Sequence, residues 1–202
     1  MVDVLVPDTR GADAAQLARR LEDEGHRVHR CMTTEPTEGC VGLTDGRCPL
    51  DSVPVDLAVS VGPPAQDGRS ADGATCAARR RIPLVLVAAE PDHPLAPWAA
   101  ATAGADAAVA VVDDVLALPL RRHTAEAERA LLHELRRQGS RSDEADVAVY
   151  RRPGRLLVDL TYGAAISRTQ AERLGTHVAQ AVRGYDRWAP KLDVTIHEAA
   201  SV

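Results

Sequence analysis

The chain has almost no aromatic side chains and a single lysine. Its 202 residues include two tryptophans, three tyrosines and no phenylalanine. Proteins that bind single-stranded nucleic acid stack bases on aromatic rings, and nonspecific DNA binding needs an excess of positive charge. With so few rings and a formal net charge of -5, the sequence predicts no nucleic-acid partner. The core must instead be aliphatic.

Long apolar runs are also missing. No stretch approaches the length that crosses a membrane, so we expect no membrane insertion. The sequence opens on an apolar strand rather than on a signal peptide, which makes the cytoplasm the expected compartment. Stable disulfides are uncommon there, so clustered cysteines indicate metal binding or redox chemistry more than structural cross-links.

Four cysteines are the most informative residues present. Cys31, Cys40 and Cys48 belong to a loop of turn-forming residues, 31–51, and Cys76 follows after a predicted strand. A polar loop cannot bury three thiols unless something draws them together, and a zinc ion, an iron–sulfur cluster or disulfides would do so. The sequence has no Cys-x-x-Cys pair, and the intervening stretches of eight, seven and twenty-seven residues differ from those of zinc ribbons and ferredoxins.

Apolar runs of strand length alternate with helical periods over the first two thirds of the chain. This alternation predicts an α/β domain, residues 1–137, with a doubly wound, parallel, five-stranded sheet of the flavodoxin-like kind. The expected strands are 4–6, 26–31, 57–61, 83–88 and 107–111, and the expected helices are 11–24, 74–81, 97–103 and 124–137.

A smaller domain is expected after a polar linker at residues 138–144. Residues 145–202 have the pattern of a ββαβ (α+β) unit, with strands 146–150 and 156–161, a helix over 167–184 and a strand over 192–197. Ser167 and Gln170 form a capping box at the start of the helix. So small a unit does not fold comfortably alone, so we expect it to pack on the first domain or on a copy of itself, giving a homo-oligomer.

The four cysteines are predicted to converge. Ligands of a doubly wound sheet bind at the carboxyl ends of its strands, and Cys31 ends the second strand there. Cys40 and Cys48 follow in the loop, and Cys76 is expected near the start of a helix, where the helix dipole favours a thiolate. All four are the predicted metal ligands, for zinc or an iron–sulfur cluster, with free structural thiols or a redox disulfide as the alternatives.

Other polar residues have simpler interpretations. His26 and His29, which precede Cys31, are expected to be surface or hydrogen-bonded residues. Residues 79–81 are three arginines, expected to form a solvated helix end. No G-x-G-x-x-G pattern is present, which argues against a dinucleotide site.

On strand–helix order, residues 1–137 resemble response-regulator receiver domains. Receivers carry a phosphoacceptor aspartate at the end of the third strand, where this sequence has Val61-Gly62. They carry a lysine at the end of the fifth, where this sequence has Val111-Val112. The resemblance implies a degenerate receiver that cannot be phosphorylated.

The stretches Leu156 to Ile166 and Leu192 to Ile196 resemble the later half of the alkaline-shock-protein family of envelope-stress proteins. That resemblance implies a non-enzymatic scaffold that self-associates or binds protein partners. The elements Cys-Pro-Leu-Asp at 48–51 and Cys-Ala-Ala-Arg-Arg-Arg-Ile-Pro-Leu-Val at 76–85 resemble uncharacterised actinobacterial proteins, which implies no activity.

Three functions follow from these observations. The first is a non-enzymatic regulatory or scaffold protein, with a four-cysteine metal or iron–sulfur site that senses redox state or holds the loop closed, and a module for self-association or partner binding. The second is an enzyme that uses the strand-end crevice, with Cys31 or Cys76 as nucleophile or the metal as Lewis acid. The third is a structural assembly subunit with inert thiols.

Overall fold

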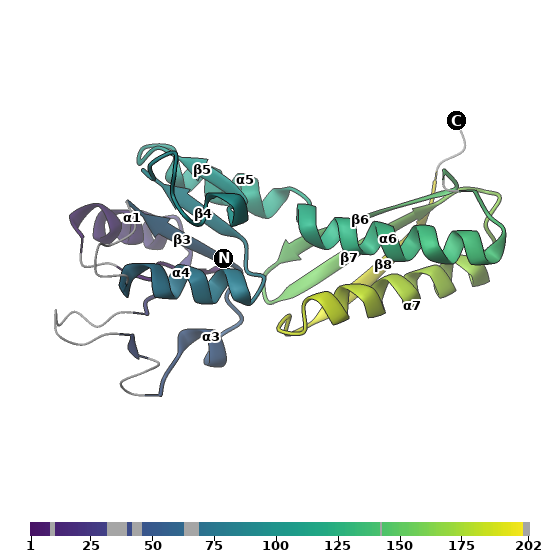
Figure 1. The fold of residues 1–202 in the computed structure, drawn as a ribbon, viewed down its shortest axis with the longest axis horizontal. Coiled ribbons are helices and arrows are strands. Elements are labelled where there is room, and N and C mark those ends of the chain that lie inside the picture. The colour runs from purple at the N-terminus through teal and green to yellow at the C-terminus, as the bar shows by residue number, and fades with distance from the viewer. Residues whose placement is uncertain (9–10, 32–39, 42–45, 63–68, 142, 200–202) are drawn as a thin grey trace. The chain divides into compact units, whose positions relative to one another are not determined.

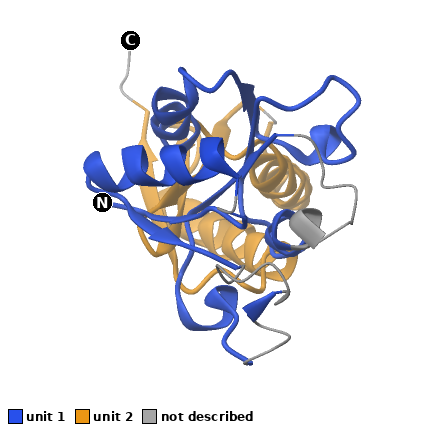
Figure 2. Cartoon of the chain, turned by 90° about the vertical axis from the view of Figure 1, so that its left-hand side faces the viewer, with its two compact units in different colours: residues 1–117 blue, residues 118–202 orange. Residues whose placement is uncertain are grey.

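The chain divides into two compact units, residues 1–117 and 118–202, each with its own sheet and its own core (Figure 2). The structure is a computed structural model that describes residues 1–8, 11–31, 40–41, 46–62, 69–141 and 143–199. Most of the predicted cysteine-rich loop, at 32–39 and 42–45, therefore lies outside the described residues.

Unit 1 (residues 1–117) is built on a five-stranded parallel sheet with the strand order β2-β1-β3-β4-β5. The predicted α/β class and the five parallel strands are confirmed. Its elements are β1 Asp3–Leu5, α1 Ala12–Asp23, β2 Arg27–His29, α3 Pro49–Ser52, β3 Leu57–Val61, α4 Arg69–Arg79, β4 Leu84–Val87, a 3-10 turn η1 Ala96–Trp98, β5 Ala101–Ala103 and α5 Ala108–Ala117.

The two faces of this sheet are covered by different helices. Successive side chains of a strand point to opposite faces, so each central strand contributes to two apolar clusters. One cluster joins alternate residues such as Val4 and Val59 to α1 and α5. The other joins Leu5 and Ala58 to α3 and α4, and it also contains Cys31. The aliphatic core expected from the composition is thus split by the sheet.

The fifth strand lies earlier in the chain than predicted. Residues 101–103, expected in a helix, form β5, and all but the first of residues 107–111, expected to form the strand, lie in the first part of α5. Ala108, Val112 and Val115 are buried at helical spacing. A run of alanine and valine fits a buried strand and a buried helix equally well, so periodicity alone could not separate the two.

Unit 2 (residues 118–202) is a three-stranded sheet with the order β6-β7-β8, and α6 and α7 lie side by side on one face (Figure 1). The predicted hairpin is confirmed, with β6 and β7 antiparallel and Arg152 opposite Arg155. The capping box of Ser167 and Gln170 is also present. The elements are α6 Arg121–Gln138, β6 Ala145–Arg152, β7 Arg155–Tyr162, α7 Arg168–Tyr185 and β8 Leu192–Glu198.

Helix α6 packs within unit 2, although the sequence suggested a domain end at residue 137. Ala127, Leu131 and Leu135 lie in the same core as Val149 and Leu174. The division between the units falls after residue 117, and residues 139–144 connect α6 to β6 inside unit 2. The amphipathic pattern of α6 showed a buried face without showing which sheet that face covers.

Candidate functional site

Cys31 is buried at the carboxyl edge of the five-stranded sheet. It comes two residues after β2, and its N–H donates to the carbonyl of Pro7, just after β1, at 3.2 Å. Its own carbonyl accepts the N–H of Val41 at 2.8 Å. Only 3% of Cys31 is exposed. The predicted position of this thiol at the ligand edge of the sheet therefore agrees with the structure.

The backbone of α4 presses closely on this thiol. A Cβ placed on Gly73 would lie 3.3 Å from the Cys31 sulfur and 2.5 Å from the Cβ of Pro7. The second distance is too short for any real side chain, so position 73 requires glycine. The close approach seals one side of Cys31 with helix backbone, a role for Gly73 that sequence reasoning missed because an isolated glycine inside a helical pattern carries no specific signal.

The other three cysteines differ in exposure. Cys40 and Cys48 are half-buried and Cys76 is exposed. Cys40 precedes Val41, which bonds to Cys31, and Cys48 immediately precedes α3 and packs against the cluster that contains Cys31. Sequence reasoning placed Cys76 near a helix start. The helix begins at Arg69, so Cys76 lies in its second half and gains no stabilisation from the N-terminal dipole.

The four thiols share one electrostatic neighbourhood. Burial first, and then the charges of Cys40, Cys48 and Cys76, raise the pKa of Cys31 to about 12. The other three sulfurs therefore lie within electrostatic range of Cys31. The Cys31 thiol therefore stays protonated at neutral pH, and the convergence of the four cysteines on one ligand stays a prediction.

A salt bridge connects the elements that carry Cys48 and Cys76. The Arg80 guanidinium, one helical turn after Cys76, donates to the Leu50 carbonyl and to the Asp51 carboxylate in α3. The predicted solvated helix end is therefore partly wrong, since Arg80 fixes α3 against α4. No short motif in the sequence indicates this contact, because it joins residues about thirty positions apart.

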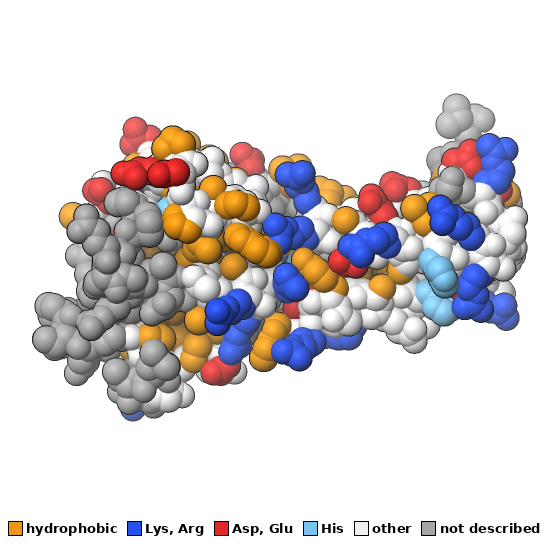
Figure 3. All heavy atoms as spheres, viewed as in Figure 1, with side chains coloured by type: hydrophobic (Ala, Val, Ile, Leu, Met, Phe, Trp, Pro, Cys, Tyr) orange, Lys and Arg blue, Asp and Glu red, His pale blue; other side chains and the backbone are white. Residues whose placement is uncertain are grey.

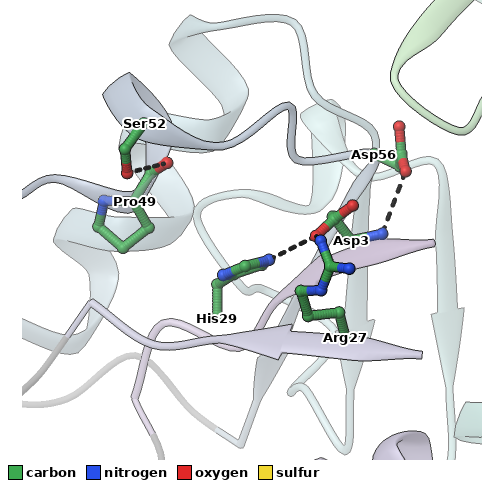
Figure 4. A network of polar contacts seen from close by, with 6 residues as sticks. All are labelled: Asp3, Arg27, His29, Pro49, Ser52 and Asp56. Carbon is green, nitrogen blue, oxygen red and sulfur yellow. Dashed lines mark hydrogen bonds and ion pairs between the residues drawn. The ribbon is translucent and has the colours of Figure 1, made fainter. Parts of the chain in front are cut away.

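The two histidines that precede Cys31 contact carboxylates, in agreement with the expectation that they are surface or hydrogen-bonded residues. The His29 Nε2 lies 2.7 Å from the Asp3 carboxylate, which also accepts from Arg27 at 3.2 Å (Figure 4). The backbone N–H of Asp3 donates to the carboxylate of Asp56, which is 1% exposed. His26 lies 3.7 Å from Asp113 in α5. This network joins β1 and β2 to Asp56, the residue just before β3.

The four cysteines form no disulfide. Within the described parts of the chain, no three or more His, Cys, Asp or Glu side chains are close enough together to hold a metal ion. Among the same described residues, no helix is both long and apolar enough to cross a membrane.

Comparison with known proteins adds little to this geometry. No protein-family model matches the chain, and no curated protein matches it. A solved structure, that of an Era variant from Aquifex aeolicus bound to GDP and AlF4-, is similar at 10% identity and a TM-score of 0.35. The alignment covers 99% of this chain and 93% of that one. At so low a TM-score the likeness supports no functional argument.

Proposed function

We propose that this chain is a non-enzymatic regulatory or scaffold protein that binds zinc or an iron–sulfur cluster through Cys31, Cys40, Cys48 and Cys76. Unit 1 is then a degenerate, receiver-like domain, and its strand order matches the flavodoxin-like order. Unit 2 supplies self-association or partner binding. The observation that supports the proposal is the position of Cys31, buried at the carboxyl edge of the sheet, with Cys48 packed against the same cluster and Cys40 next to Val41, which bonds to Cys31.

The donor chemistry of the site suits these metals. Four thiolates are a common ligand set for structural zinc and for iron–sulfur clusters. In the free protein the raised pKa of Cys31 keeps its proton in place, so a metal must displace that proton on binding. Metal affinity should therefore rise with pH. A bound metal would join the loop to the sheet edge and to α4, and its loss would release the loop.

The same pKa argues against the enzyme hypothesis with Cys31 as nucleophile. Nucleophilic cysteines react as thiolates and have a lowered pKa. Cys31 is buried and its pKa moves in the opposite direction, to about 12. Cys76 is the exposed thiol and therefore the better candidate for that hypothesis.

Zinc titration of the reduced protein tests the proposal. We expect one zinc ion per chain, with binding lost in Cys31→Ser and Cys48→Ser and proton release at neutral pH. Thr75→Ser, a half-buried neighbour of Cys76 on α4, is the matched control and should bind zinc as the wild type does. Far-UV circular dichroism of each variant verifies that unit 1 is folded. Four thiols that react at the same rates with and without zinc would contradict the proposal.

A further inference from the structure

Strand β8 is an open edge of the unit 2 sheet. The opposite edge, β6, is partly covered, because the Leu120 N–H donates to the Val149 carbonyl and the Val149 N–H donates to the Thr124 hydroxyl. β8 pairs only with β7 in the described chain. An uncovered edge strand is a ready template for pairing with another chain.

The hydrogen-bond pattern shows which residues face outward. The Lys191 carbonyl accepts from Leu156 and the Ala199 N–H donates to Tyr162, so odd-numbered residues of this segment direct their backbone groups toward β7. In a parallel ladder, alternate residues face the other way. Leu192, Val194 and Ile196 therefore present their N–H and C=O groups at the open edge.

An apolar groove lies along the same edge. It has a volume of about 750 Å³ and runs between β8 and α7. Val194 is 36% exposed within it. The strand side is formed by Leu192, Val194 and Ile196, and the helix side includes the small residues Gly175 and Ala179.

Charges on the other face of β8 are already paired within unit 2. Asp193 contacts Arg155 at 2.9 Å and Lys191 at 3.3 Å, and His197 lies 3.3 Å from Asp159. Burial raises the pKa of Asp193, but hydrogen bonds and charge from Lys191 and Arg155 more than offset this, so its pKa is lowered. Proteins commonly protect edges with charge, proline or bulges, and β8 has no proline and a continuous register with β7.

We propose that a second copy of this chain pairs its β8 antiparallel with this β8, with the two-fold axis at Val194. Residues whose backbone groups point outward must lie opposite one another to hydrogen-bond, so even-numbered residues of one β8 pair with even-numbered residues of the partner's β8. Directly opposed residues lie on the same face of the sheet. Leu192 then meets the partner's Ile196, and Val194 meets the partner's Val194. The result is a continuous six-stranded sheet in which the two apolar grooves adjoin.

Charge complementarity supports this partner. Glu172 and Arg183 line the groove at opposite ends of α7. Gly175 lies against Ile196, so the Glu172 end of α7 is beside the C-terminal end of β8. Arg183 donates to the Ala189 carbonyl, so the Arg183 end of α7 is beside the N-terminal end of β8. The two-fold axis reverses these ends. Each copy's Glu172 therefore faces the partner's Arg183, a self-complementary arrangement typical of two-fold interfaces.

The helical face of unit 2 is a poorer surface for a second copy. Helices α6 and α7 carry eight arginines (five and three) against four glutamates (three and one). Figure 3 shows Lys and Arg side chains spread over this face. Two such faces would repel each other. The inference deepens the self-association part of the proposed function, and it does not depend on the thiol site.

Sedimentation velocity of the full-length reduced chain tests the dimer. We expect a dimer at micromolar concentration that Val194→Lys weakens by about tenfold or more, because two charges then meet on the axis. Asp146→Lys is the matched control, since Asp146 is exposed on β6, at the opposite edge of the same sheet. That variant should dimerise as the wild type does. A wild-type chain that stays monomeric, including one that instead binds an extended peptide, would overturn the inference.

A charge exchange makes the test specific to this interface. Glu172→Arg and Arg183→Glu should each be monomeric, because like charges meet at both ends of the groove. An equimolar mixture of the two variants should form a heterodimer with both pairs restored. A mixture that stays monomeric would overturn the inference. The same measurements in a Cys31→Ser background should give the same results, which separates failure of the dimer from failure of the thiol site.

Discussion

A buried polar pair holds the end of α7 to the start of α6, and removing it should be costly. Asp186 is fully buried, and its Oδ2 lies 3.0 Å from the Nε2 of His123, which is 4% exposed. Its Oδ1 accepts the backbone N–H groups of Trp188 at 3.1 Å and Ala189 at 3.0 Å. The Asp186→Ala variant leaves a buried imidazole and two backbone donors without their acceptor. Breaking a buried pair of this kind costs about 3–5 kcal/mol of the free energy of unfolding.

The chain provides its own probe for this prediction. Trp188 is in unit 2 and Trp98 is in unit 1, so denaturant unfolding of a Trp98→Phe background followed by fluorescence reports on unit 2 alone. Asp186→Asn keeps an acceptor for the backbone groups and should cost only about 1–2 kcal/mol. Asp143→Ala removes an exposed surface ion pair and should change stability by less than roughly 0.5 kcal/mol. A loss below about 1 kcal/mol in Asp186→Ala would show that the buried pair stabilises unit 2 no more than one ordinary hydrogen bond does.

Three further predictions concern other positions. Gly73→Ala should destabilise unit 1 by about 1–3 kcal/mol because its Cβ meets Pro7, and unchanged denaturation of unit 1 would contradict this. Ala88→Gly should stabilise unit 1 by about 1 kcal/mol, because Ala88 is held at a φ of 51°; a destabilised variant in thermal melts would speak against that strain. A hydrogen bond from Gln138 lowers the pKa of Glu134, so this carboxylate stabilises unit 2 above its unfolded pKa, and the stability is lost as pH falls through the folded pKa. Glu134→Gln should therefore reduce the loss in the free energy of unfolding of unit 2 as the pH is lowered. The same acid dependence in the variant and the wild type would exclude the effect.

Much of the fold could be predicted because the strands and helices of both units have different spacings of apolar residues, which can be recognised in the sequence. Strands β3 and β4 at the middle of the unit 1 sheet are short, largely apolar runs, and the β6–β7 turn contains Pro153-Gly154, so both features can be recognised from local sequence. The exchange of strand and helix near residues 101–117 was not predictable, because alanine and valine satisfy either structure when buried. The assignment of α6 to unit 2 depends on which sheet its apolar face meets, and that is a property of the packed molecule.

The candidate site was predictable in location and not in detail. Cys31 was placed correctly because it comes two residues after β2, a strand of the parallel sheet, whose carboxyl edge is the usual ligand edge. Cys76 was misplaced because α4 begins several residues earlier than its apolar pattern indicates. The contacts of Arg80 with α3 and of Gly73 with Cys31 arise from close packing between distant segments, which single-sequence patterns do not encode.

Metal content and the absorbance spectrum of the full-length protein, purified without oxygen, test the central claim most directly. We expect stoichiometric metal, either as colourless protein with one zinc per chain or as brown protein with about four iron atoms per chain. The Cys31→Ser variant should lose that metal while remaining folded. Metal-free protein with four titratable thiols, which takes up neither zinc nor iron on reconstitution, would contradict the claim that these cysteines form one site.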